Sequence, residues 1–391
     1  MVKYPEDWKK IPFDESFEVL RNNTCSRALM TEVSGIVQNI HYGDVLVKYG
    51  AILDCQNDEM PYLTEEGTRI AAQDYAQDGD VIFADTAEDE TCGKVVEIVN
   101  VGVRKVVAGL HTVFCRPKIG CFTPGWLGYW MNSSAYHDQL HSLMTGIKVL
   151  SVSKSSLSKT YIMVPKKDEQ KRIADVLGNV DKLIDNLSRR IEKKRLVKQG
   201  VMQDLLTGKK RLPGFEGEWN RVALGELLDY EQPQPYIIKS AEYAKEGVPV
   251  LTAGKTFVLG HVHEFEGVYD KVPVILFDDF LTVARFVDFP FKVKSSAAKM
   301  LSLKDASNSL LFVFMAMRSI GYVPGDHQRH WISIFSKFEI ELPSPIEQKA
   351  IAKVLGDMDG DIAKLESKLE KYRKLKQGLM GDLLTGKVRL K

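Results

Sequence analysis

Cysteine is scarce in this chain, and long apolar segments are absent. The five cysteines all lie within the first 121 of 391 residues, are odd in number and show no C-x-x-C spacing. This usage argues against a disulfide framework and favours reduced, mostly buried thiols in a cytoplasmic protein. The longest apolar run, Leu310 to Met317, has eight residues, whereas a helix that spans a bilayer needs about 18 or more. No charged-then-apolar signal pattern opens the chain, so we expect a soluble, unexported protein without a membrane partner.

An excess of charge of one sign is also missing, since the net charge is only +1. Its distribution is uneven: residues 166–212 carry 14 basic and 7 acidic side chains, and residues 343–391 carry 11 and 7. The remaining segments are therefore acidic overall. A nucleic-acid surface on them would have to be a local patch, or be completed by partner chains.

The usual catalytic motifs are absent too. No Gly-x-Gly-x-x-Gly, Gly-x-Ser-x-Gly or Asp/Asn-Pro-Pro-aromatic motif occurs. The stretch Ala253 to Thr256 is similar to a phosphate loop, but Pro249 stands where that loop needs its first glycine. His137 and His141 are spaced like metal ligands on a helix, without the glutamate of a zinc protease, so hydrogen-bonded histidines are the favoured interpretation. We predict a non-catalytic chain with no metal or cofactor of its own.

What the chain does contain is an internal duplication. Residues 165–212 return as residues 343–390 at a constant offset of 178, with 27 identities in 48 positions. A weaker echo, at an offset of 211, relates the segment that begins at Trp8 to the one that begins at Trp219. The chain therefore reads as variable segment, repeat, variable segment, repeat.

Each repeat has the apolar spacing of a coiled-coil seam, alternating steps of four and three. The stretch from Glu169 to Leu206 predicts a helix of roughly 55 Å, and Gly208 and Gly386 are placed for left-handed C-caps. We expect the two helices to pair antiparallel within the chain, making it pseudo-twofold and circular, with Lys391 near Met1. Two alternatives are packing of each helix only on its own neighbouring domain, and pairing between chains. The predicted seam consists of Ile173, Leu177, Val180, Ile184, Leu187, Ile191, Ile351, Leu355, Met358, Ile362, Leu365 and Leu369.

The variable segments read as mixed α/β. Short β-rich runs are separated by turn residues, and helical stretches follow near the ends. Both segments also close on a similar pattern of turn, alternating stretch and strand into proline. The expected fold class is α+β: two mixed α/β domains (1–164 and 213–342) joined by two long helices (165–212 and 343–391).

This organisation resembles the specificity subunit of type I DNA restriction–modification systems. The carriers are the two Glu-Gln-x-x-Ile-Ala-x-Val-Leu-Gly helices, which begin at Glu169 and Glu347, and their Leu-Leu-Thr-Gly-Lys ends. Supporting carriers are Gly79 to Ile82 and Ala108 to His111. The resemblance implies two recognition domains that read an asymmetric, bipartite site on double-stranded DNA. It also implies helices that dock two modification subunits, which bind S-adenosylmethionine, and restriction subunits that join them.

Candidate DNA contacts follow from chemistry, because Arg and Gln read bases while Lys, Ser and Thr hold phosphates. They are Arg104, Lys105, Arg116, Lys148, Ser151, Ser153, Lys154 and Ser155 in the first segment, and Lys255, Thr256, Arg285, Lys292, Lys294, Gln328, Arg329 and His330 in the second. An alternative function is a coiled-coil scaffold that tethers two protein-binding domains, which the acidic variable segments would suit.

Overall fold

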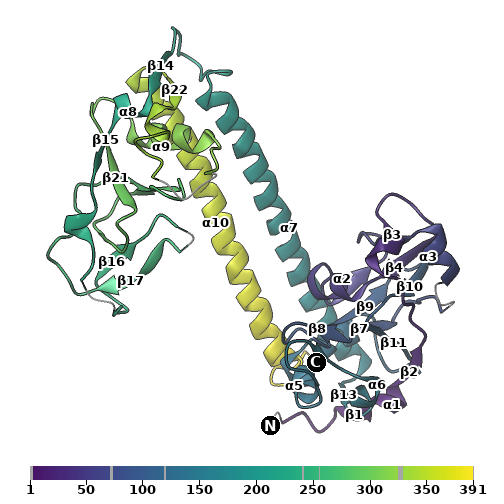
Figure 1. Ribbon diagram of the computed structural model, residues 1–391. Helices are drawn as coiled ribbons and strands as arrows, with labels where there is room; N and C mark the ends of the chain where they lie inside the picture. Colours follow the sequence, from purple (N-terminus) through teal and green to yellow (C-terminus); the bar gives the residue numbers. More distant parts are fainter. Residues whose placement is uncertain are drawn as a thin grey trace. The chain divides into compact units, whose positions relative to one another are not determined.

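The computed structural model describes residues 3–70, 74–118, 120–239, 242–254, 256–324 and 329–390. These residues form two compact units. Unit 1 combines Met1–Ser188 with Ser367–Lys391, and unit 2 is Arg189–Glu366. Each unit holds one α/β domain together with one end of each of two long helices (Figure 1). The predicted α+β class is confirmed.

The domain of unit 1 contains two sheets. The central one has the order β2 (Phe17–Leu20), β11 (Thr112–Pro117), β7 (Val81–Ala84), β9 (Val95–Val99), β5 (Ile52–Asp54), and the second has the order β10 (Lys105–Ala108), β4 (Val37–Ile40), β6 (Tyr62–Leu63), β3 (Met30–Thr31). Alternation along β7 connects two cores: Val81 and Phe83 pack against α4 (Trp126–Met131) and α5 (Ser134–His141), while Ile82 faces the second sheet. Both faces of β7 are buried, so it is continuously apolar.

The smaller elements of this domain frame the sheets. They are β1 (Lys9–Pro12), paired with β13 (Tyr161–Val164); β8 (Thr86–Ala87), paired with β12 (Leu150–Ser151); and the short helices α1 (Phe13–Ser16), η1 (Arg27–Leu29), α2 (Tyr42–Val47), α3 (Glu65–Ile70) and α6 (Lys154–Leu157).

The domain of unit 2 repeats this plan with fewer strands. Its central sheet has the order β15 (Leu228–Glu231), β21 (Ala298–Leu303), β18 (Val274–Asp278), β19 (Ala284–Val287), and its second sheet has the order β17 (Val258–Val262), β16 (Val248–Leu251), β20 (Lys292–Val293). Ile275 and Phe277 face α9 (Leu310–Ser319), while Leu276 faces the second sheet. The remaining elements are β14 (Asn220–Ala223), α8 (Leu224–Leu227), η2 (Gln234–Tyr236), η3 (Phe335–Lys337) and β22 (Glu339–Leu342).

Corresponding hydrogen bonds show that the two domains are copies of one fold. The N–H of Phe13 donates to the carbonyl of Thr160, and the N–H of Leu224 donates to the carbonyl of Phe338, both at the entrance to the domain. Leu224 comes 211 positions after Phe13, and Phe338 comes 178 positions after Thr160. These are the two offsets at which the sequence repeats itself. The similar closing patterns of the two variable segments therefore reflect a shared architecture.

The long helices are α7 (Lys167–Leu206) and α10 (Pro345–Leu383). Both end as predicted, because Gly208 and Gly386 adopt left-handed φ values of +68° and +71°. Each glycine also packs against the tryptophan of the adjoining domain, with Trp219 beside Gly208 and Trp8 beside Gly386. The same cap thus attaches each helix end to one domain.

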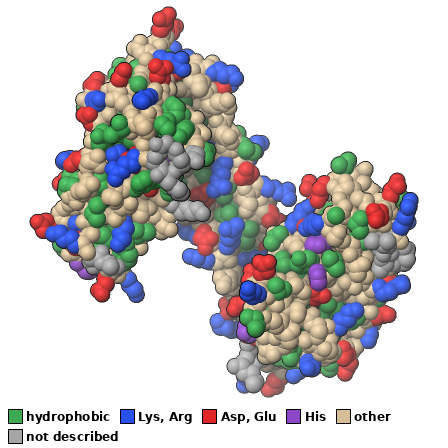
Figure 2. All heavy atoms as spheres, in the orientation of Figure 1, with side chains coloured by type: hydrophobic (Ala, Val, Ile, Leu, Met, Phe, Trp, Pro, Cys, Tyr) green, Lys and Arg blue, Asp and Glu red, His purple; other side chains and the backbone are tan. Residues whose placement is uncertain are grey.

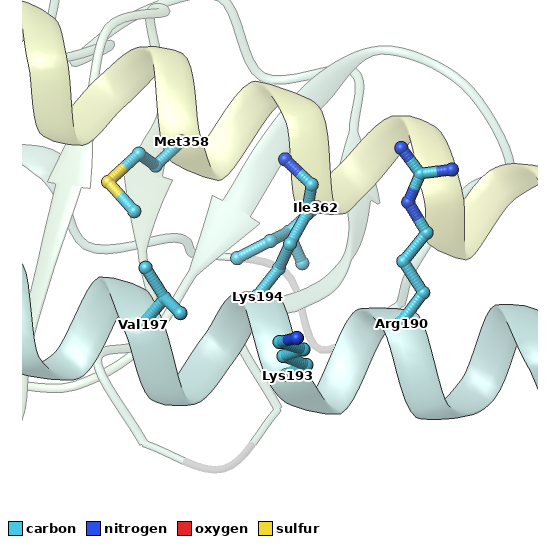
Figure 3. Close-up of a pocket in the computed structure, with 6 residues that line it drawn as sticks. All are labelled: Arg190, Lys193, Lys194, Val197, Met358 and Ile362. Atoms are coloured by element: carbon cyan, nitrogen blue, oxygen red, sulfur yellow. The ribbon is translucent and has the colours of Figure 1, made fainter.

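Within each unit the two helices run antiparallel. In unit 2, Lys194 pairs with Asp361 at 3.0 Å, while the later residue Arg211 pairs with the earlier Glu347 at 2.5 Å. Figure 3 shows this part of the helix pair, with Val197 of α7 opposite Met358 of α10. The antiparallel pairing expected from the sequence is confirmed within the units.

Unit 1 repeats the ion pairs of unit 2. Lys376 pairs with Asp181 at 2.6 Å, and Lys198 pairs with Asp359 at the positions 178 residues away. Arg389 likewise pairs with Glu169 at 2.6 Å, as Arg211 does with Glu347. The duplication therefore preserves contacts as well as sequence.

All twelve predicted seam residues are buried or half-buried. In unit 1 the helices pack on the domain as well as on each other, because Ile173 and Leu177 of α7 share one apolar cluster with Trp126 of the domain and Leu383 of α10. Helix pairing and packing on the neighbouring domain, which were alternatives in the sequence, therefore occur together.

Described residues near the two termini contact each other within unit 1. Met1 and Lys391 lie outside the described residues, but Arg389 pairs with Asp7 at 2.8 Å and also with Glu169. Hydrogen bonds from the guanidinium, first to Glu169 and then to Asp7, raise the pKa of Arg389.

Among the described residues, no helix is both long enough and apolar enough to cross a membrane.

Candidate nucleic-acid interface

One aspartate in each domain anchors the segment that the sequence selected for DNA contact. Asp85 follows β7, and its carbonyl accepts the N–H of Val152 at 2.8 Å. Asp279 follows β18, and its carbonyl accepts the N–H of His330 at 2.9 Å. Val152 and His330 are 178 positions apart, so two stretches of unlike sequence occupy the same place on the same fold.

In the first domain, the predicted stretch from Lys148 to Ser155 forms a projecting edge. Lys148, Ser153, Lys154 and Ser155 are exposed, and Ser151 is half-buried. Gly146 has a φ of +119°, and a Cβ there would lie 1.9 Å from the carbonyl oxygen of Val149. Only glycine fits this turn. The hydroxyl of Ser153 accepts the N–H of Ser156 at 3.0 Å and lies 2.8 Å from that of Ser155, while Lys148 and Lys154 are exposed.

The other first-domain candidates lie at or next to the ends of β10 and β11 that are farther from Asp85. Lys105 begins β10, and its ammonium lies 5.8 Å from the ring centroid of Tyr75. Arg116, near the end of β11, donates to the carbonyl of Tyr75 at 2.9 Å and pairs with Asp80 at 2.7 Å. Arg104 is exposed on the turn before β10. The guanidinium of Arg116 therefore already has a carboxylate partner, and the hydrogen bonds to Asp80 raise its pKa.

In the second domain, three candidates gather around the loop 252–257. Lys294 donates its N–H to the carbonyl of Leu251 at 3.3 Å, where this loop begins. The guanidinium of Arg285 donates to the carbonyl of Gly254 at 3.3 Å and lies over the ring of Phe257. Thr256 is exposed. Lys255 and Gln328, which were also predicted, lie outside the described residues.

The structure does not present Lys292 or His330 to solvent. Lys292 is 2% exposed; its ammonium donates to the carbonyl of Glu266 at 2.5 Å and lies 3.4 Å from Glu264. Pairing of β20 with β16 places it where the buried Val107 stands in the first domain. His330 is 0% exposed, whereas its neighbour Arg329 is exposed. We therefore leave Lys292 and His330 out of the proposed contact surface.

Sequence reasoning missed a buried acid in the first domain. Glu97 accepts the N–H groups of Gly125 and Gly128, each at 2.7 Å, at the start of α4. Burial raises the pKa of Glu97 to about 7, against the effect of these hydrogen bonds. Register places Phe286 at the same position of the second domain, where it packs on Phe314. Nothing in the local sequence distinguishes Glu97 from an exposed strand residue.

The described residues contain no group of three or more His, Cys, Asp or Glu side chains placed to hold a metal ion. His137 instead lies 3.0 Å from the carbonyl oxygen of Cys92, and His141 is exposed. All five cysteines are free, and four are buried.

Figure 2 shows Lys and Arg side chains interspersed with Asp and Glu on the visible face of each unit. The fold defines a class of protein in which one α/β domain occurs twice, once in each unit, and in both units segments of the same two long helices run antiparallel.

Comparison with known proteins gives this class a family. The model of the "type I restriction modification DNA specificity domain" matches residues 5–194 and again residues 216–372. The chain therefore belongs to the type I restriction–modification specificity family, as the sequence resemblance implied. It is a specificity subunit with two target recognition domains.

Individual relatives agree. The specificity subunit of the Escherichia coli EcoR124I/EcoR124II restriction enzyme is 39% identical over 186 residues, which are 44% of this chain and 46% of that protein. The chain thus matches about half the length of that relative. A putative MjaX specificity subunit from Methanocaldococcus jannaschii is 26% identical, with 99% of this chain and 95% of that protein covered.

Solved structures share the fold. The S subunit of a type I restriction–modification system from M. genitalium superposes with a TM-score of 0.63 at 15% identity, covering 98% of this chain and 97% of that one. A chain from a study of type I complex assembly and conformational transition gives a TM-score of 0.54 at 14% identity, covering 99% and 100%.

Proposed function

We propose that this chain reads an asymmetric, bipartite sequence on double-stranded DNA, one half with each domain. The observation that carries the proposal is the equivalent anchoring of two unlike segments on Asp85 and Asp279. A shared scaffold with different exposed side chains suits a common docking mode on two different half-sites. The recognition domains are residues 1–164 and 213–342, and the spacer helices are 165–212 and 343–391.

The proposed contact surface of the first domain is the stretch Lys148 to Ser155, whose ammonium and hydroxyl groups suit phosphate oxygens. In the second domain it is the loop 252–257 with Arg285, Lys294 and Arg329, where guanidinium groups can read guanine edges. Arg104 and Lys105 form a second, more peripheral basic group. Because the domains are not strongly basic, this surface depends on local placement and on partner chains for its affinity.

The partners follow from the family. Two modification subunits, which bind S-adenosylmethionine, dock on the paired helices, and restriction subunits join that complex in the cytoplasm. The twelve seam residues hold the helix pair together, since an exposed apolar stripe would otherwise have to be covered by another chain. Exposed charges on the helices then remain available to the partners.

The test is sequencing of methylated adenines in the host with and without this chain. Loss of one bipartite, asymmetric mark on deletion supports the proposal, and an unchanged set of marks contradicts it. A salt titration of DNA binding by the assembled complex provides a second measurement, because phosphate contacts make log K fall linearly with log salt. Binding that ignores salt would favour the protein-tethering scaffold instead.

A further inference from the structure

Three side chains that the charge-based selection missed converge at one end of the first domain. The parallel strands β4 and β10 end at Ile40 and Ala108, so the segments that follow them, which contain Tyr42 and His111, leave the same sheet edge. Strand β11 begins beside the end of β7, with Thr112 opposite Ala84. Asp85 therefore comes next to His111.

These side chains touch in a row. Nδ1 of His111 lies 3.5 Å from Oδ1 of Asp85. The ring of His111 meets the ring of Tyr42 edge-on, with centroids 5.3 Å apart and an interplanar angle of 77°. The ring centroids of Tyr42 and His41 are 4.6 Å apart. His41 caps α2, because its Nδ1 accepts the N–H of Gly43 at 3.2 Å. The row is thus fixed to a helix start and to a strand end.

The backbone of His111 is strained. Its φ is +54°, a left-handed value that residues other than glycine rarely adopt. The turn before it is tightly packed, because a Cβ on Gly109 would lie 2.7 Å from Nδ2 of Asn39 and 2.8 Å from the carbonyl oxygen of Ile40. The carbonyl of His111 also accepts the N–H of Asp85 at 3.1 Å. Residues held in such conformations concentrate at binding sites.

The row is open to solvent and chemically suited to base edges. The side chain of His111 is 50% exposed and that of Asp85 27%. Among the described residues, no Lys or Arg forms an ion pair with Asp85. DNA phosphates repel a carboxylate, so an aspartate on a DNA-facing edge is suited to a base donor, such as the N4 amino group of cytosine. With Nδ1 of His111 directed at Asp85, Nε2 remains for a second contact.

We propose that Tyr42, Asp85 and His111 determine the specificity of the first domain, and that Asp85 accepts a hydrogen bond from the amino group of a cytosine in the major groove. The inference rests on the proposed DNA-reading function. Asp85 also anchors Val152, so the base reader adjoins the stretch proposed to hold phosphates. The second domain lacks this reader, because Asp279 is buried against Lys299 and Ala297 takes the place of His111. The half-sites therefore differ.

The test uses the complex assembled from the full chain and its partners, with a randomised DNA library and sequencing of the bound fraction. Asp85→Ala should reduce discrimination at one position of the first half-site by roughly ten- to a hundredfold, with the second half-site and the salt slope unchanged. His111→Gly should lose discrimination without a fall in Tm, since glycine tolerates the left-handed φ. His141→Ala, another exposed histidine of the same domain, is the matched control.

The outcomes separate the two claims. If the wild-type complex selects a bipartite site and both variants select the same one, the assignment of the reader is wrong while the proposed function stands. If His111→Gly weakens binding to all sequences equally and flattens the salt dependence, while Asp85→Ala selects the wild-type site, His111 contacts a phosphate and the inference is overturned. A wild-type complex that selects no site overturns both. Should Asp85→Ala fail to fold, His111→Gly decides the question.

Discussion

At the scale of single residues, charge on a projecting edge has a measurable consequence. Lys148 and Lys154 are exposed on the stretch anchored by Asp85, and neither takes part in an ion pair within the described residues. Replacing both with alanine should make the salt dependence of DNA binding shallower by about two units of slope, because each phosphate contact contributes about 0.9.

This loss of affinity should be the same for all sequences. The matched control is Lys9→Ala with Lys10→Ala, two exposed lysines of β1 in the same domain, which should leave the slope unchanged. Altered sequence preference at constant slope would show that the edge reads bases and does not hold phosphates.

Glu97 gives a prediction about pH. Burial raises its pKa to about 7 in the folded protein, above the value of about 4.3 expected in an unfolded chain. The folded state therefore holds more protons between these values, so this contribution to stability is complete below about pH 4.3 and is lost as pH rises toward 7.

Glu97→Gln should remove this slope from a plot of Tm against pH between about 5 and 7. Glu15→Gln, at an exposed position of the same domain, should retain it. A wild-type profile that rises over this window would contradict the assignment.

At the scale of elements, the duplicated helix caps provide a matched pair of substitutions. A Cβ on Gly386 would lie 2.5 Å from ring atoms of Pro5, whereas one on Gly208 would lie 3.4 Å from Trp219. Both substitutions to alanine force a left-handed conformation that costs roughly 1–2 kcal/mol. Gly386→Ala adds an overlap with Pro5, so it should lower the free energy of unfolding more than Gly208→Ala does.

Denaturant unfolding of the two variants measures this difference. Gly200→Ala, inside α7 where a Cβ meets nothing within 4 Å, should stabilise the chain by roughly 0.5–1 kcal/mol. Equal losses for the two cap glycines would show that the contact of the second cap with Pro5 relaxes without cost.

At the scale of the whole molecule, the contact between Arg389 and Asp7 leads to a prediction about connectivity. A permutant that joins Lys391 to Met1 by a short linker and opens the chain at Gly214 should fold and keep its DNA specificity. The new ends then fall in a turn where Gly214 and Gly217 have positive φ values, so no helix or strand is interrupted.

Circular dichroism, Tm and library selection check the result. A second permutant opened between Ser188 and Arg189, inside α7, should be strongly destabilised because it cuts a helix of 40 residues. A well-folded second permutant together with an unfolded first one would contradict the closed connectivity.

The sequence by itself determined the architecture. A constant offset of 178, the spacing of apolar residues from Ile173 onward and the glycines at 208 and 386 predicted two long helices with matching ends. Helix periodicity and cap chemistry are local, so they can be read without knowing the rest of the fold. The two variable segments then indicated two mixed α/β domains, and the resemblance to type I specificity subunits implied that these are recognition domains.

Only the tertiary structure decided which candidate side chains reach solvent and which meet. Lys292 resembles a surface lysine in the sequence, yet strand pairing buries it at the position of Val107. Asp85 and His111 are 26 positions apart in the sequence and come together because β11 begins beside the end of β7. Strand order and register arise from long-range packing, so neither the burial of Lys292 nor the row formed with Tyr42 could be read from the amino acids near them.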